Sequence, residues 1–263
     1  MAREDLKLAI ERHATSKLPN NDLQAITTLG FRGEALPSIA AVSRFFLSSR
    51  ARNGELAWMI NVEGGETRGP SPAALSNGTE ATIRDLFYAT PARLKFLRTE
   101  RTETRRIIDT IKRIAMCYPE ISFRLIVDGK LRLRYAEEEG DVVDIRLERL
   151  KSVMGREFSE NALPINAQRN GLLVKGLAGV PTLNRANASM QYLFVNKRPV
   201  NDRLLVGAVR GAYADFLARN RHPLVALYLE ADPKFVDINV HPAKTEVRFQ
   251  DPKLVRGLIV GAL

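Results

Sequence analysis

The sequence contains one cysteine, three histidines and no long apolar run among its 263 residues. Cys117 cannot form an internal disulfide and has no ligand cluster near it, so the apolar helix predicted around it makes it a core residue. No stretch approaches the roughly 20 apolar residues that a bilayer-spanning helix needs, and the opening MAREDLKLAIER lacks a signal-peptide core. These absences argue against a disulfide scaffold and a membrane anchor, and they predict a cytoplasmic protein.

The sequence also has fewer acidic than basic residues, and its formal net charge is +10. Residues 1–150 hold 24 Lys and Arg against 21 Asp and Glu, whereas residues 151–263 hold 16 against 9. A basic second half is typical of proteins that bind a phosphate backbone by charge neutralisation. A basic surface without a partner remains the alternative from charge alone.

The length favours two domains, and the 45% apolar and 27% charged composition is that of a globular protein. The periodicity predicts helices at 3–12, 34–42, 91–117, 142–153 and 201–219, and strands at 45–50, 57–62, 81–86, 123–127, 131–135, 172–178, 192–196, 223–230 and 235–240. Asp128-Gly129 is the strongest hairpin signal. Because helices and strands alternate without a regular βαβ rhythm, the sequence predicts an α+β sandwich.

The most informative stretch is Gly30-Phe31-Arg32-Gly33-Glu34-Ala35-Leu36. Two glycines around a bulky residue and an arginine allow backbone N–H groups to turn into a concave anion nest, and a predicted helix follows directly. Phosphate is the natural ligand of such a nest. A Gly-x-x-Gly loop also serves as a plain turn, and the residues alone leave both interpretations open.

GFRGEALPSIAAVS, which begins at Gly30, closely resembles the mobile nucleotide lid of the MutL family of mismatch-repair ATPases. That family belongs to the GHKL superfamily of gyrase, heat-shock chaperone, histidine-kinase and MutL ATPases. Four more blocks resemble it in the same order: AIERHATSK at 9–17, GTEATIRDLFYATPARLKFL at 78–97, FVNKRPVNDR at 194–203 and DINVHPAKTEVRF at 237–249. The likeness covers essentially the whole chain.

The resemblance implies a site for ATP with Mg²⁺ in the complete protein. Hydroxyl and ammonium groups of residues 15–17 would line the pocket, residues 30–35 would wrap the phosphates, residues 78 and 79 would lie beneath the adenine end, and a lysine from the second domain would reach the γ-phosphate. The implied nucleotide-binding residues are Thr15, Ser16, Lys17, Gly30, Phe31, Arg32, Gly33, Glu34, Ala35, Gly78, Thr79 and Lys244.

Arg198 and Arg203 lie in a block that resembles the family's DNA-facing surface, and guanidinium groups there would contact phosphates rather than base edges. Binding to DNA is therefore expected to be independent of sequence. His13 and His241 have no partners at metal-site or triad spacing, so both are interpreted as loop or packing residues. The basic helix at 93–113 is interpreted as a solvated face.

Two family motifs are absent from this sequence: the helix with a water-activating glutamate and a magnesium-binding asparagine, and the Asp-x-Gly-x-Gly loop that recognises adenine. We therefore expect no catalytic residue and no metal ligand in this chain, weak or absent nucleotide binding, and no ATP hydrolysis. The sequence is expected to start at an internal methionine, through truncation or a misplaced start codon. We likewise expect this sequence to lack the family's C-terminal dimerisation region.

The expected fold is α+β, with a GHKL-type ATPase α/β sandwich lacking its first motifs at 1–140 and a β-α-β domain of ribosomal-protein type at 141–263. The acidic run at 137–141 marks the boundary between them. The resemblance implies a homodimeric ATPase that couples mismatch recognition by a MutS-type protein to strand processing, associated with DNA in the cytoplasm. The alternatives are a type II topoisomerase-like ATPase fragment and a non-enzymatic nucleic-acid-binding module.

Overall fold

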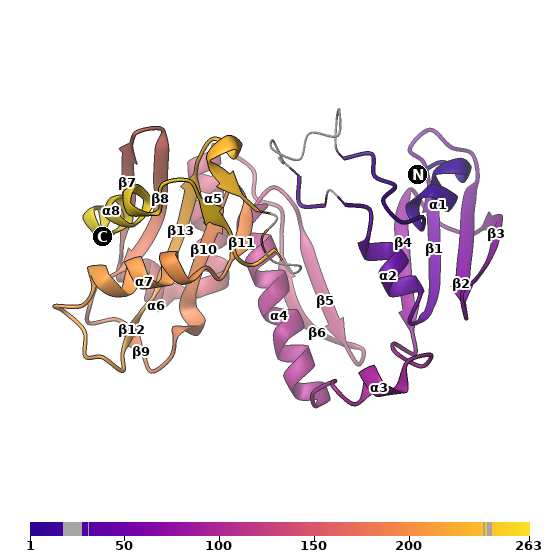
Figure 1. Ribbon diagram of the computed structural model, residues 1–263, viewed down its shortest axis with the longest axis horizontal. Coiled ribbons are helices and arrows are strands. Elements are labelled where there is room, and N and C mark those ends of the chain that lie inside the picture. Colours follow the sequence, from indigo (N-terminus) through magenta and orange to yellow (C-terminus); the bar gives the residue numbers. More distant parts are fainter. Residues whose placement is uncertain (18–27, 31, 239, 241–243) are drawn as a thin grey trace. The chain divides into compact units, whose positions relative to one another are not determined.

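The computed structural model describes residues 1–17, 28–30, 32–238, 240 and 244–263. These residues form two compact units, one up to Thr99 and the other from Glu100 onward (Figure 1). The helices are α1 (Arg3–Ala9), α2 (Ala35–Ala40), α3 (Pro91–Leu94), α4 (Glu100–Cys117), α5 (Val142–Met154), α6 (Arg156–Glu160), α7 (Arg203–Ala212) and α8 (Pro252–Ala262).

The strands are β1 (Arg44–Arg50), β2 (Ala57–Glu63), β3 (Glu66–Ala73), β4 (Gly78–Arg84), β5 (Phe123–Val127), β6 (Lys130–Tyr135), β7 (Ala162–Arg169), β8 (Leu172–Gly179), β9 (Asn184–Arg185), β10 (Gln191–Val195), β11 (Arg198–Val200), β12 (His222–Pro223), β13 (Val225–Glu230), β14 (Val236–Asp237) and β15 (Arg248–Phe249). Short 3₁₀ helices cover Ala188–Met190 and Pro233–Phe235. The mixture of helices and mainly antiparallel sheets confirms the predicted α+β class.

The first unit is an antiparallel sheet in the order β3-β2-β1-β4, with α1 packed on β2 and β3 and α2 on β1. Strand β1 alternates strictly between buried and half-buried residues, so that Phe45, Leu47 and Ser49 point to the side that α1 and α2 cover. Leu6 of α1 is fully buried against this side. The core cluster here comprises Leu6, Ala40, Phe45, Leu47, Ile60 and Val62.

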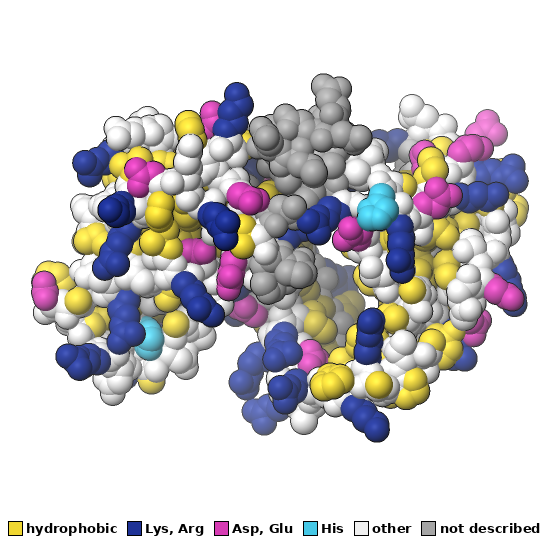
Figure 2. Space-filling model, viewed as in Figure 1, with side chains coloured by type: hydrophobic (Ala, Val, Ile, Leu, Met, Phe, Trp, Pro, Cys, Tyr) yellow, Lys and Arg dark blue, Asp and Glu magenta, His cyan; other side chains and the backbone are white. Residues whose placement is uncertain are grey.

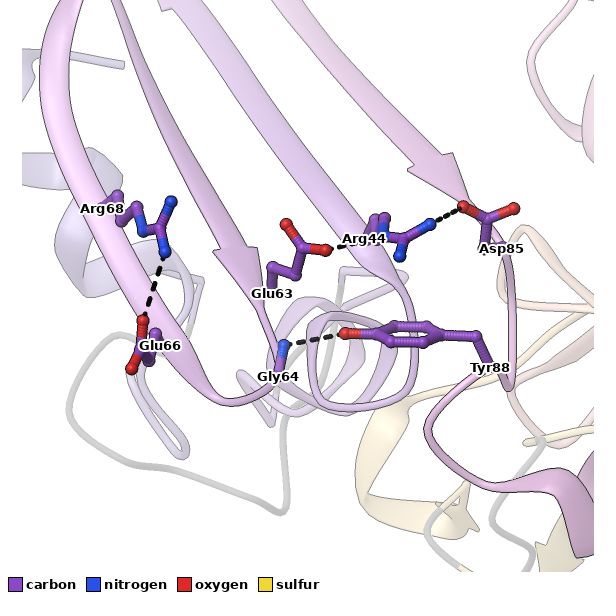
Figure 3. Close-up of polar contacts among 7 residues, drawn as sticks. All are labelled: Arg44, Glu63, Gly64, Glu66, Arg68, Asp85 and Tyr88. Atoms are coloured by element: carbon purple, nitrogen blue, oxygen red, sulfur yellow. Dashed lines mark hydrogen bonds and ion pairs between the residues drawn. The ribbon is translucent and has the colours of Figure 1, made fainter.

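At one end of this sheet Arg44 connects three strands (Figure 3). Its guanidinium group donates to Glu63 Oε1 at 2.6 Å and to Asp85 Oδ2 at 2.6 Å, and it lies 4.9 Å from the ring centroid of Tyr88. The Tyr88 hydroxyl accepts the backbone N–H of Gly64 at 2.9 Å. The ends of β1, β2 and β4 are thereby joined through side chains as well as through the ladder.

The second unit is built on a five-stranded sheet in the order β11-β10-β13-β8-β7. Strands β10 and β13 are parallel and are connected through α7, whereas the other pairs are antiparallel. This is the predicted β-α-β arrangement. One face of the sheet, with Tyr192, Phe194 and Tyr228, packs in a single core cluster with α4, α5 and α6. Helix α8 packs on β7 and β8 and against α7.

Helix α4 packs against the β5–β6 hairpin, whose turn residues Asp128 and Gly129 have φ of 51° and 72°. Two consecutive residues with positive φ define the tight hairpin turn that Asp-Gly predicts. Burial raises the pKa of Cys117, at the end of α4, to about 12. The predicted role of Cys117 as an inert core residue is consistent with its 4% exposure.

Some predicted elements were wrong. The helix predicted at 91–117 is interrupted between α3 and α4, and the acidic first turn of α4, with Glu100 and Glu103, favours a new helix start there. Strands β3 and β7 and helix α8 were not predicted. The units divide at Thr99, so α4 and the β5–β6 hairpin pack with the second unit. The domain boundary at 140 stays a prediction.

Candidate nucleotide site

The structure brings together two segments that the sequence singles out, residues 13–17 and the described residues of the glycine loop, 28–30 and 32–35. The backbone N–H of His13 donates to the carbonyl oxygen of Gly33 at 3.2 Å. Gly33 has a φ of 61°, and a Cβ on it would lie 2.2 Å from the carbonyl oxygen of Ala14. Only glycine allows so close an approach, so Gly33 is required for these two segments to lie side by side.

The same two segments also bring Lys17 close to Gly30. The hydroxyl of Thr28 donates to the carbonyl oxygen of Gly30 at 2.8 Å, and it also lies 3.4 Å from that of Lys17. The Lys17 ammonium group is 3.6 Å from the place where a Cβ on Gly30 would be. The backbone N–H of Lys17 donates to the Thr15 hydroxyl at 3.2 Å. A positive charge therefore lies beside the backbone of the glycine loop.

The remaining predicted lid residues lie around the start of α2. Glu34 precedes α2, and its carbonyl oxygen accepts the N–H of Ser38 at 3.1 Å. Its carboxylate lies 3.7 Å from His13 Nδ1, and His13 itself is a loop residue with a φ of 68°. Ser16, Arg32 and Ala35 are exposed. Phe31 and His241 lie outside the described residues.

Gly78 and Thr79, predicted beneath the adenine end, open strand β4. Thr79 pairs in register with Ser49 of β1, and a Cβ on Gly78 would meet no atom within 4 Å. Ser49 is fully buried, and its Oγ lies 2.9 Å from the Thr79 hydroxyl. The sequence analysis did not identify Ser49. It could have been found as a serine at an inward-facing position of an alternating strand, where the other inward-facing residues, Phe45 and Leu47, are apolar.

Lys244 belongs to the second unit, where it is half-buried with a φ of 55°. The carbonyl oxygen of the next residue, Thr245, accepts the N–H of Asn201 at 2.7 Å. This bond brings the lysine loop to the start of α7, where Asp202 caps the helix by accepting the N–H groups of Leu204 and Leu205. The first residue of α7, Arg203, is exposed.

Arg198 differs from Arg203 in its exposure. Arg198 lies in β11 and is only 7% exposed, and burial lowers the pKa of its guanidinium group. Figure 2 shows other Lys and Arg side chains gathered over α4 and around α7. Of the two arginines predicted to face DNA, only Arg203 therefore presents its side chain freely to solvent, and the DNA role of Arg198 stays a prediction.

Within the described residues no cluster of three His, Cys, Asp or Glu side chains could hold a metal ion. No helix in the described part of the chain is both long and apolar enough to cross a bilayer.

Residues 150–263 match the protein family described as DNA mismatch repair protein, C-terminal domain. The whole chain is 57% identical to the DNA mismatch repair protein MutL of Paramagnetospirillum magneticum and spans 43% of it. Over 98% of its length it is 55% identical to the MutL of Rhodospirillum rubrum, of which it spans 41%. The chain thus spans less than half of these relatives.

A solved structure, the Aquifex aeolicus MutL ATPase domain complexed with ADP, is similar over 86% of this chain and 76% of that one. The TM-score is 0.62, and the two sequences are 29% identical. This likeness confirms the predicted GHKL-type fold.

Proposed function

The chain belongs to the MutL family of DNA mismatch-repair proteins, and from this premise we propose that it binds ATP through its first unit and duplex DNA through its second. The observation that carries the nucleotide proposal is the pairing of residues 13–17 with residues 28–30 and 32–35, which places the Lys17 ammonium group beside Gly30. An ammonium group and a glycine backbone are both suited to a polyphosphate.

Each predicted group has a separate task in this proposal. Lys17 and the backbone of residues 30–35 bind the phosphates, Thr79 and Gly78 contact the base, and Lys244 binds the terminal phosphate as a point charge. Among the described residues no group of three His, Cys, Asp or Glu side chains could hold a metal ion. No general base for water activation is proposed in this chain.

For the whole protein we propose the role that the family implies. It would act as a homodimer that binds ATP, responds to mismatch recognition by a MutS-type protein and couples it to strand processing, in the cytoplasm and close to DNA. The 57% identity to a MutL protein favours this function over a type II topoisomerase fragment. The second candidate is a nucleic-acid-binding module without nucleotide response, favoured by the basic second half.

Calorimetric titration with ATP and with ADP tests the nucleotide proposal. We expect weak binding of both, and Lys17→Met should weaken both by roughly tenfold because a charge-assisted hydrogen bond is lost. Lys244→Met should weaken ATP binding and leave ADP binding unchanged. The matched control is Lys7→Met, which removes an exposed lysine from α1.

Two outcomes would contradict the proposal. Absence of binding by the unsubstituted chain at millimolar nucleotide would favour the nucleic-acid-binding module. An equal loss in the Lys7 and Lys17 variants would mean that net charge, and not the position of Lys17, attracts the nucleotide.

A further inference from the structure

Ser49 is a polar residue at a position where the strand pattern demands an apolar one. It is fully buried, and its hydroxyl is within hydrogen-bond distance of three groups. The main-chain nitrogen of Met1 lies at 2.8 Å, the carbonyl oxygen of Gly78 at 3.1 Å and the hydroxyl of Thr79 at 2.9 Å. Burying a hydroxyl is costly unless it is hydrogen-bonded, and here every partner is a group at the predicted adenine end or beside it.

The number of protons available decides the direction of these bonds. A serine hydroxyl has one proton to donate and can accept two hydrogen bonds. The main-chain nitrogen of Met1 can only donate, and the carbonyl oxygen of Gly78 can only accept. All three contacts are satisfied together when Ser49 donates to Gly78 and accepts from both Met1 and Thr79. If Ser49 donated to Thr79 instead, the Gly78 carbonyl would lose this bond.

This arrangement of hydrogen bonds determines what the exposed Thr79 hydroxyl can offer to a ligand. Directly paired residues lie on the same face of a sheet, so Thr79 continues the side on which Ser49 is buried into a region that solvent reaches. Its only hydroxyl proton is engaged by Ser49. Toward a ligand, the Thr79 oxygen can therefore act only as a hydrogen-bond acceptor. The open space over Gly78 leaves room for a flat group beside it.

We propose that Ser49 is a positioning residue that sets base preference: it holds the Thr79 hydroxyl as an acceptor, so that the site selects a purine with an amino group at C6. A 6-amino group donates to that oxygen, whereas a 6-oxo group presents a second acceptor to it. This inference rests on the proposed nucleotide binding and names the feature of the base that the site recognises.

The test compares the affinities of the chain for ATP and for inosine triphosphate, which differs in carrying oxygen at C6. The unsubstituted chain should prefer ATP. Ser49→Ala frees the Thr79 proton to face the ligand, so the ratio of the two affinities should fall roughly threefold to tenfold, the range for one net hydrogen bond. Ser49→Thr keeps the hydroxyl and should retain the ratio. Ser48→Ala, the neighbour on the opposite face of β1, is the matched control.

The outcomes separate this proposal from a structural role and from the proposed function. If Ser49→Ala weakens ATP and inosine triphosphate equally, Ser49 only supports the fold and the inference is wrong. Equal binding of both nucleotides by the unsubstituted chain overturns the inference while nucleotide binding stands. If neither nucleotide binds, the proposed function and the inference fail together. Should Ser49→Ala not fold, Ser49→Cys carries the same test, because a thiol is a weak acceptor of similar size.

Discussion

Arg149 is the largest side chain without solvent exposure among the described residues. Its guanidinium group donates to the carbonyl oxygens of Ala115 at 3.1 Å, Pro119 at 2.9 Å and Ile121 at 3.1 Å, and also to that of Ala136. The end of α4, the loop after it and the end of the hairpin are thus connected to α5. Burial lowers the pKa of Arg149, with the Glu138 carboxylate at 3.8 Å acting in the opposite direction.

We expect Arg149→Met to destabilise the second unit by about 3–5 kcal/mol, because backbone carbonyl groups that cannot be replaced lose their donor. The free energy of unfolding in urea, followed by circular dichroism, measures this. Lys151→Ala on the same helix is the control. Lys151 is half exposed and forms a surface ion pair with Glu148, so its loss should change stability by less than about 1 kcal/mol. Equal effects of the two substitutions would refute the role given to Arg149.

The role of an individual residue could be predicted where the backbone geometry alone determines which residue type fits. Gly33 was predicted to shape the loop, and the 2.2 Å approach to Ala14 gives the reason. Arg149 could have been found too, since the helical period places it between Ile145 and Val153 on the buried stripe. Arg198 was predicted as a surface residue, yet β11 is covered in this unit. A short strand of three residues does not reveal which of its faces is buried.

At the scale of elements, turn chemistry was the better guide and helix length the poorer. Asp128-Gly129 fixed its hairpin, because few dipeptides accept two positive φ values. A continuous helix at 91–117 was predicted wrongly, because helical periodicity does not show which apolar residues are buried in a core. Leu94, Phe96 and Leu97, between or next to the two helices, are 48%, 82% and 42% exposed. The sequence of strand β3, with Pro70 and Pro72, does not predict a strand. The strand lies at the sheet edge, where proline is tolerated.

The start of α7 is the element on which the DNA proposal can be tested. Arg203 is exposed there, and the bond between Asn201 and Thr245 brings the lysine loop beside it. Arg203→Glu should weaken binding of matched and mismatched duplexes alike and reduce the salt dependence of binding, because a phosphate contact releases counterions. Gel shifts at several salt concentrations measure this.

The charge-matched control is Lys253→Glu on α8, which changes the net charge by the same amount at another exposed position. If both variants lose affinity equally, binding follows overall charge and α7 has no special part in it. Affinity that hardly responds to salt would contradict a phosphate-backbone interface altogether.

At the scale of the whole molecule, the two units differ in the cores that stabilise them. Among the described residues, the cluster in the first unit has six buried members, whereas one cluster in the second unit has fifteen, including Met116, Phe158 and Phe194. Burial of apolar surface contributes roughly 25 cal/mol per Å², so a core of less than half the size provides less stability. The sequence predicted two domains from its length and a less stable first half, but it did not show which faces meet to form each core, because burial depends on the tertiary arrangement.

The chain carries its own probe in each unit. Its one tryptophan, Trp58, packs against the first core with the Arg3 guanidinium 4.6 Å from its ring centroid, and its one cysteine is buried in the second core. Because burial raises the pKa of Cys117 to about 12, the native thiol is protonated at pH 8, whereas an unfolded thiol with a pKa of about 8.5 reacts. With increasing urea we expect the Trp58 fluorescence transition to precede thiol labelling. Trp58→Phe and Cys117→Ala identify each signal, and coincident transitions in a monomeric sample would mean that the units unfold as one.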